Sequence, residues 1–131
     1  MKKLLTVIFI LSSSIVFAKD VRQIAKEIQQ QVSNQLPQKL SKNLLLRSVI
    51  SSDETLIFNV MLLYNKSFLQ DRLKQSGRTM DSIKNQMKGM AKTTICSSPI
   101  TSSFINLGGK IHYKYIFQNG EHYLLKEINS C

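Results

Sequence analysis

Residues 110–129 read KIHYKYIFQNGEHYLLKEIN, and this stretch decides the fold. Apolar and polar residues alternate on both sides of Asn119-Gly120, and Asn-Gly between two alternating runs is the strongest short hairpin signal. The pattern predicts antiparallel strands at residues 110–117 and 121–129. An antiparallel sheet is therefore the expected framework of the fold.

The register of this hairpin separates a core face from a solvent face. A two-residue turn places Phe117 opposite His122 and Tyr115 opposite Leu124. On the solvent face His112 lies across from Glu127, which we interpret as a cross-strand charge pair rather than as catalytic machinery. The expected core face consists of Ile111, Tyr113, Tyr115, Phe117, Leu124 and Ile128.

Two β-type runs upstream, at residues 44–51 and 55–64, predict a second hairpin. The polar turn Ser52-Asp53-Glu54 separates them. This hairpin is apolar on both faces, which indicates either helices on both sides of the sheet or a surface offered to a partner. We favour double coverage by the protein's own helices. The residues that would form the partner surface are Leu44, Leu46, Ile57, Met61 and Leu63.

Helical periodicity fills most of the remaining chain. In the first helix, apolar residues recur three and four positions apart, and Gln29, Gln30 and Gln31 are expected to face outward. Capping and breaking residues mark one helix before the hairpin at 44–64 and three helices after it. The element order α-ββ-ααα-ββ predicts an α+β domain, an antiparallel sheet from two hairpins packed with helices. The marker residues are Asp20, Pro37, Gly77, Thr79 or Asp81, Pro99 and Gly108.

The amino terminus is typical of a cleavable signal peptide. Lys2 and Lys3 precede an apolar run at residues 4–11 that is too short for a membrane span, which needs about 20 residues. Val16 and Ala18 suit the −3 and −1 positions of a cleavage site. We expect residues 1–18 to be removed and residues 19–131 to form one domain, periplasmic or secreted. A retained membrane anchor is the alternative.

Cys96 and Cys131 are the two cysteines of the chain. An even number of cysteines in an exported protein predicts a disulfide bond. The bond would close a long loop and stabilise the fold by about 3–4 kcal/mol in the chain-entropy model. The alternative, a redox or metal pair, lacks both a C-x-x-C spacing and clustered histidines.

The chain is strongly basic. After loss of Lys2 and Lys3, sixteen basic residues face eight acidic ones, so the mature net charge is +8. This charge favours acidic partners and also keeps a small exported protein soluble. Nucleic acid is disfavoured, because no aromatic residues interleave with Lys84, Lys88 and Lys92 as a stacking platform requires. The residues that could bind anionic lipid or lipopolysaccharide are Lys84, Lys88 and Lys92, spaced four apart on one helix flank. Arg72, Lys74 and Arg78 lie just upstream and could join them in one basic patch. The alternative is a solvated helix face.

The sequence contains no recognisable reaction chemistry. There is no nucleophile elbow, P-loop or dinucleotide fingerprint, and the two histidines lie outside any zinc-ligand spacing. We therefore expect no catalytic residues, no metal and no cofactor, with a small hydrolase as the weaker alternative. The predicted function is a non-catalytic envelope protein that binds another exported protein or assists secretion or pilus-type assembly.

The segment from Cys96 to Cys131 resembles a known pattern. It combines a cysteine at a helix end, a short helix led by Pro99, the pair Gly108-Gly109, a tyrosine-rich hairpin and a second cysteine. This pattern is similar to small exported bacterial proteins of unassigned role, including the quorum-sensing-regulated virulence factor family. The resemblance implies the disulfide and the α+β fold, and it carries no catalytic residue across.

Overall fold

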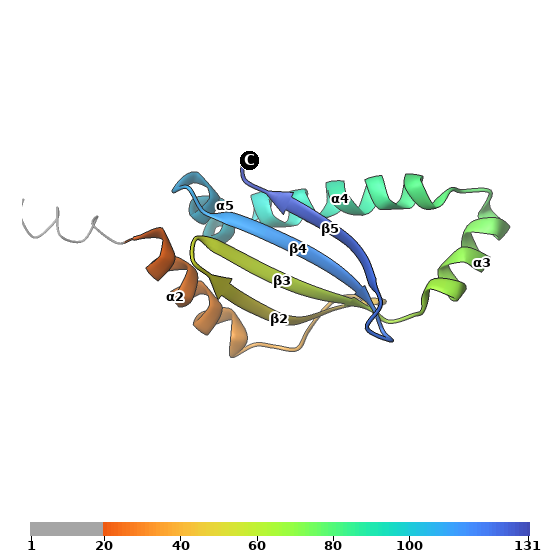
Figure 1. Cartoon of the computed structure of the whole chain (residues 1–131), viewed down its shortest axis with the longest axis horizontal. Coiled ribbons are helices and arrows are strands. Elements are labelled where there is room, and N and C mark those ends of the chain that lie inside the picture. Colours follow the sequence, from red (N-terminus) through yellow and green to blue (C-terminus); the bar gives the residue numbers. More distant parts are fainter. Residues whose placement is uncertain (1–19) are drawn as a thin grey trace, which may run out of the picture.

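The structure, a computed structural model, describes residues 20–131 as an α+β fold (Figure 1). The predicted signal peptide and its cleavage site lie outside these residues. Within residues 20–131, no helix has both the length and the apolar character needed to cross a membrane. The elements are, in order, α2 Val21–Ser33, β1 Gln38–Ser41, β2 Leu44–Ser52, β3 Thr55–Leu62, α3 Lys66–Ser76, α4 Met80–Ser97, α5 Pro99–Asn106, β4 Lys110–Phe117 and β5 His122–Ile128.

The five strands form one sheet in the order β1-β2-β3-β4-β5. Both predicted hairpins are present, β2–β3 and β4–β5, and the α+β fold class is confirmed. The expectation of an antiparallel sheet needs one correction, because β3 and β4 pair in parallel from Thr55 opposite Lys110 to Leu62 opposite Phe117. Parallel neighbours require a long crossover connection, and α3, α4 and α5 supply it. The short edge strand β1 was not predicted.

Local sequence signals account for the helix ends. The Asp20 side chain accepts a hydrogen bond from the Arg22 amide at the start of α2, and Thr79 accepts one from the Ser82 amide at the start of α4. Gly77 ends α3 in the left-handed conformation, with φ of 70°, which glycine adopts without a steric penalty. The predicted caps at Asp20 and Thr79 are therefore confirmed.

A bulge corrects the register of the second hairpin. Tyr115 faces Leu124 as predicted, but Ile116, not Phe117, lies opposite His122. Tyr123 is the extra residue on β5, and its side chain is buried beside that of Leu124. A β-bulge redirects side chains in this way, so the alternation that is regular in β4 is interrupted in β5.

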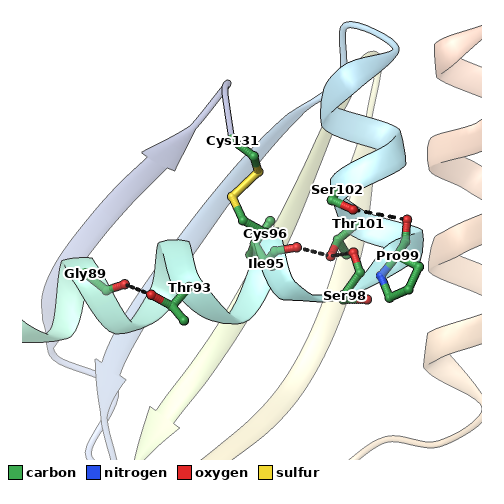
Figure 2. Close-up of a disulfide and its surroundings, with 9 residues drawn as sticks. All are labelled: Gly89, Thr93, Ile95, Cys96, Ser98, Pro99, Thr101, Ser102 and Cys131. Carbon is green, nitrogen blue, oxygen red and sulfur yellow. Dashed lines mark hydrogen bonds between the residues drawn. A yellow bond between two sulfur atoms is a disulfide. The ribbon is translucent and has the colours of Figure 1, made fainter.

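Helices cover one face of the sheet, which corrects the expectation of double coverage. Burial alternates along β3 and β4, and α2, α4 and α5 all pack on the buried side. In Figure 2, α4 and α5 lie together in front of the strands. The opposite face, here called the open face, is covered by no helix of residues 20–131. The largest fully buried side chains are Phe104, Phe117, Leu56, Leu62, Ile111 and Val60.

Polar and covalent links join the helices to the sheet. Gln29 does not point outward as expected, because its side-chain oxygen accepts hydrogen bonds from the Ser51 amide at 2.7 Å and the Ser51 hydroxyl at 2.6 Å. The predicted disulfide is present between Cys96, near the end of α4, and Cys131, beyond β5 (Figure 2). These links fix α2 and α4 against the two halves of the sheet.

Candidate binding site

Helix α3 stands at the end of the molecule opposite α2 and extends away from the sheet (Figure 1). It buries only Leu69 and Leu73. The other side of the helix is left free to line a depression. We call this depression, between α3, the start of α4 and the end of the β4–β5 hairpin, the α3 groove. Its volume is about 630 Å³.

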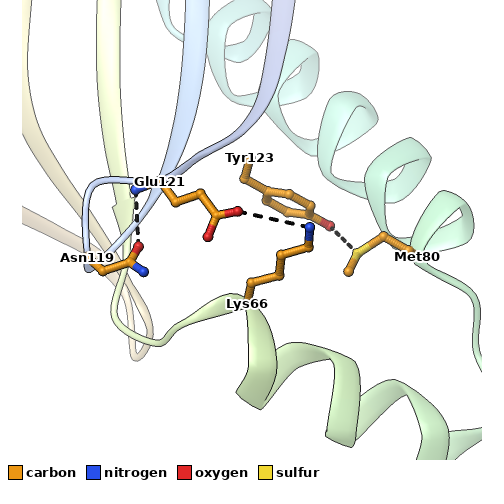
Figure 3. Close-up of polar contacts among 5 residues, drawn as sticks. All are labelled: Lys66, Met80, Asn119, Glu121 and Tyr123. Atoms are coloured by element: carbon orange, nitrogen blue, oxygen red, sulfur yellow. Dashed lines mark hydrogen bonds and ion pairs between the residues drawn. The ribbon is translucent and has the colours of Figure 1, made fainter.

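Apolar and aromatic side chains form the floor of the α3 groove. Phe117 and Tyr123 come from the two strands of the hairpin, and their ring centroids are 4.8 Å apart. The Tyr123 hydroxyl donates to the sulfur of Met80 over 3.4 Å, which joins the hairpin to the start of α4 (Figure 3). Leu73 of α3 completes the floor. The floor therefore takes residues from three separate parts of the chain.

Burial keeps the phenol of Tyr123 protonated. Desolvation, with a smaller contribution from repulsion by an ionised Tyr64, raises the pKa of Tyr123 to about 12. Near neutral pH the Tyr123 side chain is therefore uncharged, and its hydroxyl remains a hydrogen-bond donor. The floor of the α3 groove carries no negative charge of its own.

The rim of the α3 groove is cationic. Lys66, Lys74, Arg78 and Lys84 line it, and among its lining residues Asp71 is the single carboxylate. The ammonium group of Lys84 lies 5.6 Å from the centroid of the Tyr123 ring, within the range of a cation–π contact. Lys66 is partly neutralised, because its Nζ lies 4.0 Å from a carboxylate oxygen of Glu121 (Figure 3).

A second cavity, of about 680 Å³, lies on the other side of α3. It is lined by Lys42 and Arg72 and by no acidic residue of the described chain. Phe68 is 48% exposed here, with the Arg72 guanidinium 5.3 Å from its ring centroid and the Tyr64 ring at 5.6 Å. Both sides of α3 thus carry positive charge, and on the side of the second cavity Phe68 adds an exposed aromatic ring.

The structure divides the predicted basic flank. Lys84 is half-buried and lines the α3 groove, whereas Lys88 and Lys92 lie one and two turns further along α4, outside the groove lining. Lys84 instead lines the same groove as Lys74 and Arg78, which precede it in the sequence by ten and six residues. Of the predicted basic patch, Lys74, Arg78 and Lys84 therefore line one groove, whereas Lys88, Lys92 and Arg72 lie outside its lining.

The predicted partner surface is also divided. Leu46 is 5% exposed and Leu44 packs against the core, because both lie on the covered face of the sheet. Neither side chain is available there to a partner. Ile57 and Met61 lie on the open face, and Leu63 lines the second cavity beside α3.

The remaining chemical candidates occupy isolated positions. His112 Nε2 lies 3.8 Å from a carboxylate oxygen of Glu127 on the open face, the cross-strand pair predicted from the register. Within residues 20–131, no three histidine, cysteine, aspartate or glutamate side chains gather where they could hold a metal ion. The charged and aromatic groups of the described residues therefore converge around α3, and the α3 groove has the larger number of cationic residues in its lining.

Comparison with known proteins reveals relatives in fold. No family model matches the chain, and no curated protein matches its sequence. Solved structures do match. EpsS, a pilotin of the Vibrio vulnificus type 2 secretion system, has a TM-score of 0.65 and 11% identity, covering 84% of this chain and 88% of EpsS. AspS, a type II secretion system pilotin from Vibrio cholerae, has a TM-score of 0.62 and 11% identity, covering 82% and 87%.

A third match is a Pseudomonas aeruginosa protein described as secreted. Its TM-score is 0.61 at 12% identity, covering 83% of this chain and 88% of that one. At these identities the likeness is one of fold. The expected resemblance to small exported bacterial α+β proteins is confirmed at that level. The narrower resemblance to the quorum-sensing-regulated virulence factor family stays a prediction.

Proposed function

We propose that this protein is a non-catalytic accessory factor of the bacterial envelope that binds another exported protein during secretion or assembly. The observation that carries the proposal is the fold shared with two type II secretion pilotins over 82–84% of the chain. Export of the chain, expected from the signal-peptide pattern of residues 1–18, agrees with such a role. The α3 groove supplies the binding site.

The α4 wall of the groove is held in place before a partner arrives, because α4 is fixed to the sheet at its middle and near its end. On the sheet side, the buried Tyr115 hydroxyl donates to the Met87 carbonyl oxygen over 3.2 Å and ties β4 to α4. The disulfide between Cys96 and Cys131 fixes the far end of α4, and such bonds persist in the oxidising compartments outside the cytoplasm. A preformed site pays less conformational entropy on binding than a flexible one.

Photo-crosslinking in the bacterium that makes the protein tests this proposal. A photoreactive amino acid replaces Gln70 in the α3 groove, Ser48 on the open face or the exposed Gln23 on α2. We expect one exported protein to be crosslinked repeatedly from position 70 and not from position 23. Absence of a crosslinked partner at all three positions, with each variant exported and folded, would contradict the proposed function.

A further inference from the structure

We infer that the α3 groove binds an acidic peptide segment that inserts one large apolar side chain onto the groove floor. The inference rests on the proposed function and names the chemistry of the partner. It is carried by the charge of the rim, by the composition of the floor and by the placement of the remaining lysines.

The rim selects for negative charge. Because Glu121 partly neutralises Lys66, the cations left to meet a ligand are Lys74, Arg78 and Lys84, against the single carboxylate of Asp71. The adjoining cavity around α3 adds further basic residues. A cleft lined by one sign of charge raises the local concentration of the opposite charge and steers its approach. An occupant rich in glutamate or aspartate therefore complements the groove.

The floor selects for an apolar anchor. Phe117, Tyr123, Met80 and Leu73 line the bottom of the groove. Phe117, Leu73 and Tyr123 are 1%, 7% and 8% exposed and Met80 is partly buried, so the apolar area left open is small and suits one side chain rather than several. Interfaces gain most of their affinity from a few large side chains buried in such pockets and surrounded by a polar rim. The flanking acidic residues of the peptide then reach the rim.

The same observations favour a peptide over a lipid surface. Anionic lipid would engage a row of exposed lysines, but Lys84 is turned into the groove over Tyr123 while Lys88 and Lys92 lie outside it. The apolar residues lining the groove match a single side chain better than the long acyl chain of a lipid. The experiments distinguish binding of a peptide in the groove from binding of a lipid surface.

A tryptophan reporter locates binding, because the natural chain contains no tryptophan. Gln70→Trp places the indole at the exposed groove wall, and Lys92→Trp places one on α4 away from the groove. The probe is a short synthetic peptide with several glutamates around one phenylalanine. We expect its addition to shift the emission of the Gln70→Trp protein and to leave that of Lys92→Trp unchanged. An equal shift at both positions, or none at either, would overturn the inference.

Paired charge variants test the rim. Lys74→Gln with Arg78→Gln and Lys88→Gln with Lys92→Gln remove the same charge, but only the first pair lines the groove. We expect the groove pair to weaken peptide binding about tenfold, or about 1.4 kcal/mol, and the α4 pair to change it less than about twofold. Equal losses would indicate nonspecific attraction and contradict the inference. Circular dichroism verifies that both variants are folded.

Probe variants test the anchor and the lipid alternative. Replacing the peptide phenylalanine by alanine should weaken binding about tenfold, and replacing its glutamates by glutamine should abolish the salt dependence of binding. Phosphatidylglycerol vesicles should not compete for the reporter site. The inference is wrong if vesicles bind the parent protein but not the Lys88→Gln, Lys92→Gln variant, and if the peptide binds neither. The basic residues would then form a lipid-binding surface.

The proposed accessory function and the peptide-binding inference can be contradicted independently of each other. If crosslinking in cells captures a partner through Ser48 while the peptide leaves the groove reporter unchanged, the accessory function stands and the groove inference is wrong. If the peptide binds in the groove but no position captures a partner in cells, the proposed function is wrong.

Discussion

The hydroxyl of Tyr115 on β4 donates a hydrogen bond to the carbonyl oxygen of Met87 on α4 over 3.2 Å, and the bond is buried. It connects the middle of the sheet to the middle of the longest described helix. The bond therefore holds α4 at the position where its first turns border the α3 groove.

Tyr115→Phe removes this bond while keeping the ring in the core. A buried hydrogen bond contributes about 0.5–1.5 kcal/mol net, so we expect the free energy of unfolding to fall by about 1 kcal/mol. The thermal midpoint should fall by roughly 3–6 °C. Tyr113→Phe is the matched control, because no hydrogen bond from the Tyr113 hydroxyl is seen among the described residues. Equal losses in the two variants would show that the bond to Met87 contributes nothing specific.

Reduction of the disulfide should destabilise the protein without changing its architecture. Cys96 and Cys131 are 35 positions apart, and opening a loop of this length costs about 3–4 kcal/mol in the chain-entropy model. Cys96→Ser with Cys131→Ser should lower the urea midpoint by the same amount as reductant does in the parent. Mass spectrometry of the protein isolated from its own bacterium without reductant checks the bond itself. Two free thiols there would contradict the pairing.

Gly109 marks a close approach that tolerates no side chain. A Cβ atom at this position would overlap the ring of Phe104, which is 1% exposed and packed in the core. Gly109→Ala should therefore lower the free energy of unfolding by about 1–3 kcal/mol. Gly89→Ala is the opposite case, because Gly89 lies in α4 with open space around it and alanine is the better helix former by up to about 1 kcal/mol. Urea unfolding of both variants should give changes of opposite sign.

Much of the fold was predictable because its signals are local. Asp20, Thr79 and Gly77 act within one helical turn of their own positions, so the helix ends follow from the sequence. The Asn119-Gly120 turn likewise needs no distant partner. The parallel pairing of β3 with β4 was not predictable in this way, because it depends on where a connection of three helices returns the chain.

The candidate site was harder to predict than the fold. The closeness of Lys74, Arg78 and Lys84 in the sequence suggested a shared basic patch, but the groove that they line depends on the turn between α3 and α4. Tyr123 was not among the predicted core residues, because strict alternation puts it on the face opposite Leu124 and the bulge on β5 breaks that alternation. The open face was misjudged because an apolar strand pattern does not say whether a helix covers it.

Alkaline pH should unfold the protein through its buried tyrosines. Burial raises the pKa of Tyr113 to about 12, while an unfolded tyrosine titrates near 10. Burial also raises the pKa values of Tyr64, Tyr115 and Tyr123 above the ordinary value. Above pH 10 the unfolded chain loses protons that the folded chain keeps, so the free energy of unfolding must fall as pH rises. The stabilisation is complete below pH 10 and is lost progressively between pH 10 and 12.

Tyr113→Phe tests this effect, because the variant retains the ring and removes one ionisable group, together with the smaller repulsion by which Tyr113 raises the pKa of Tyr115. The parent should lose roughly 2 kcal/mol more stability than the variant between pH 9 and pH 12, since each unit of pKa shift corresponds to about 1.4 kcal/mol. The two proteins share all their other ionisable groups, so contributions common to both cancel in the difference. Urea unfolding followed by circular dichroism at several pH values gives this difference, and ultraviolet absorbance reports tyrosinate directly. Parallel pH profiles in the two proteins, or tyrosinate formation near pH 10 with the fold intact, would show that Tyr113 is not protected by burial.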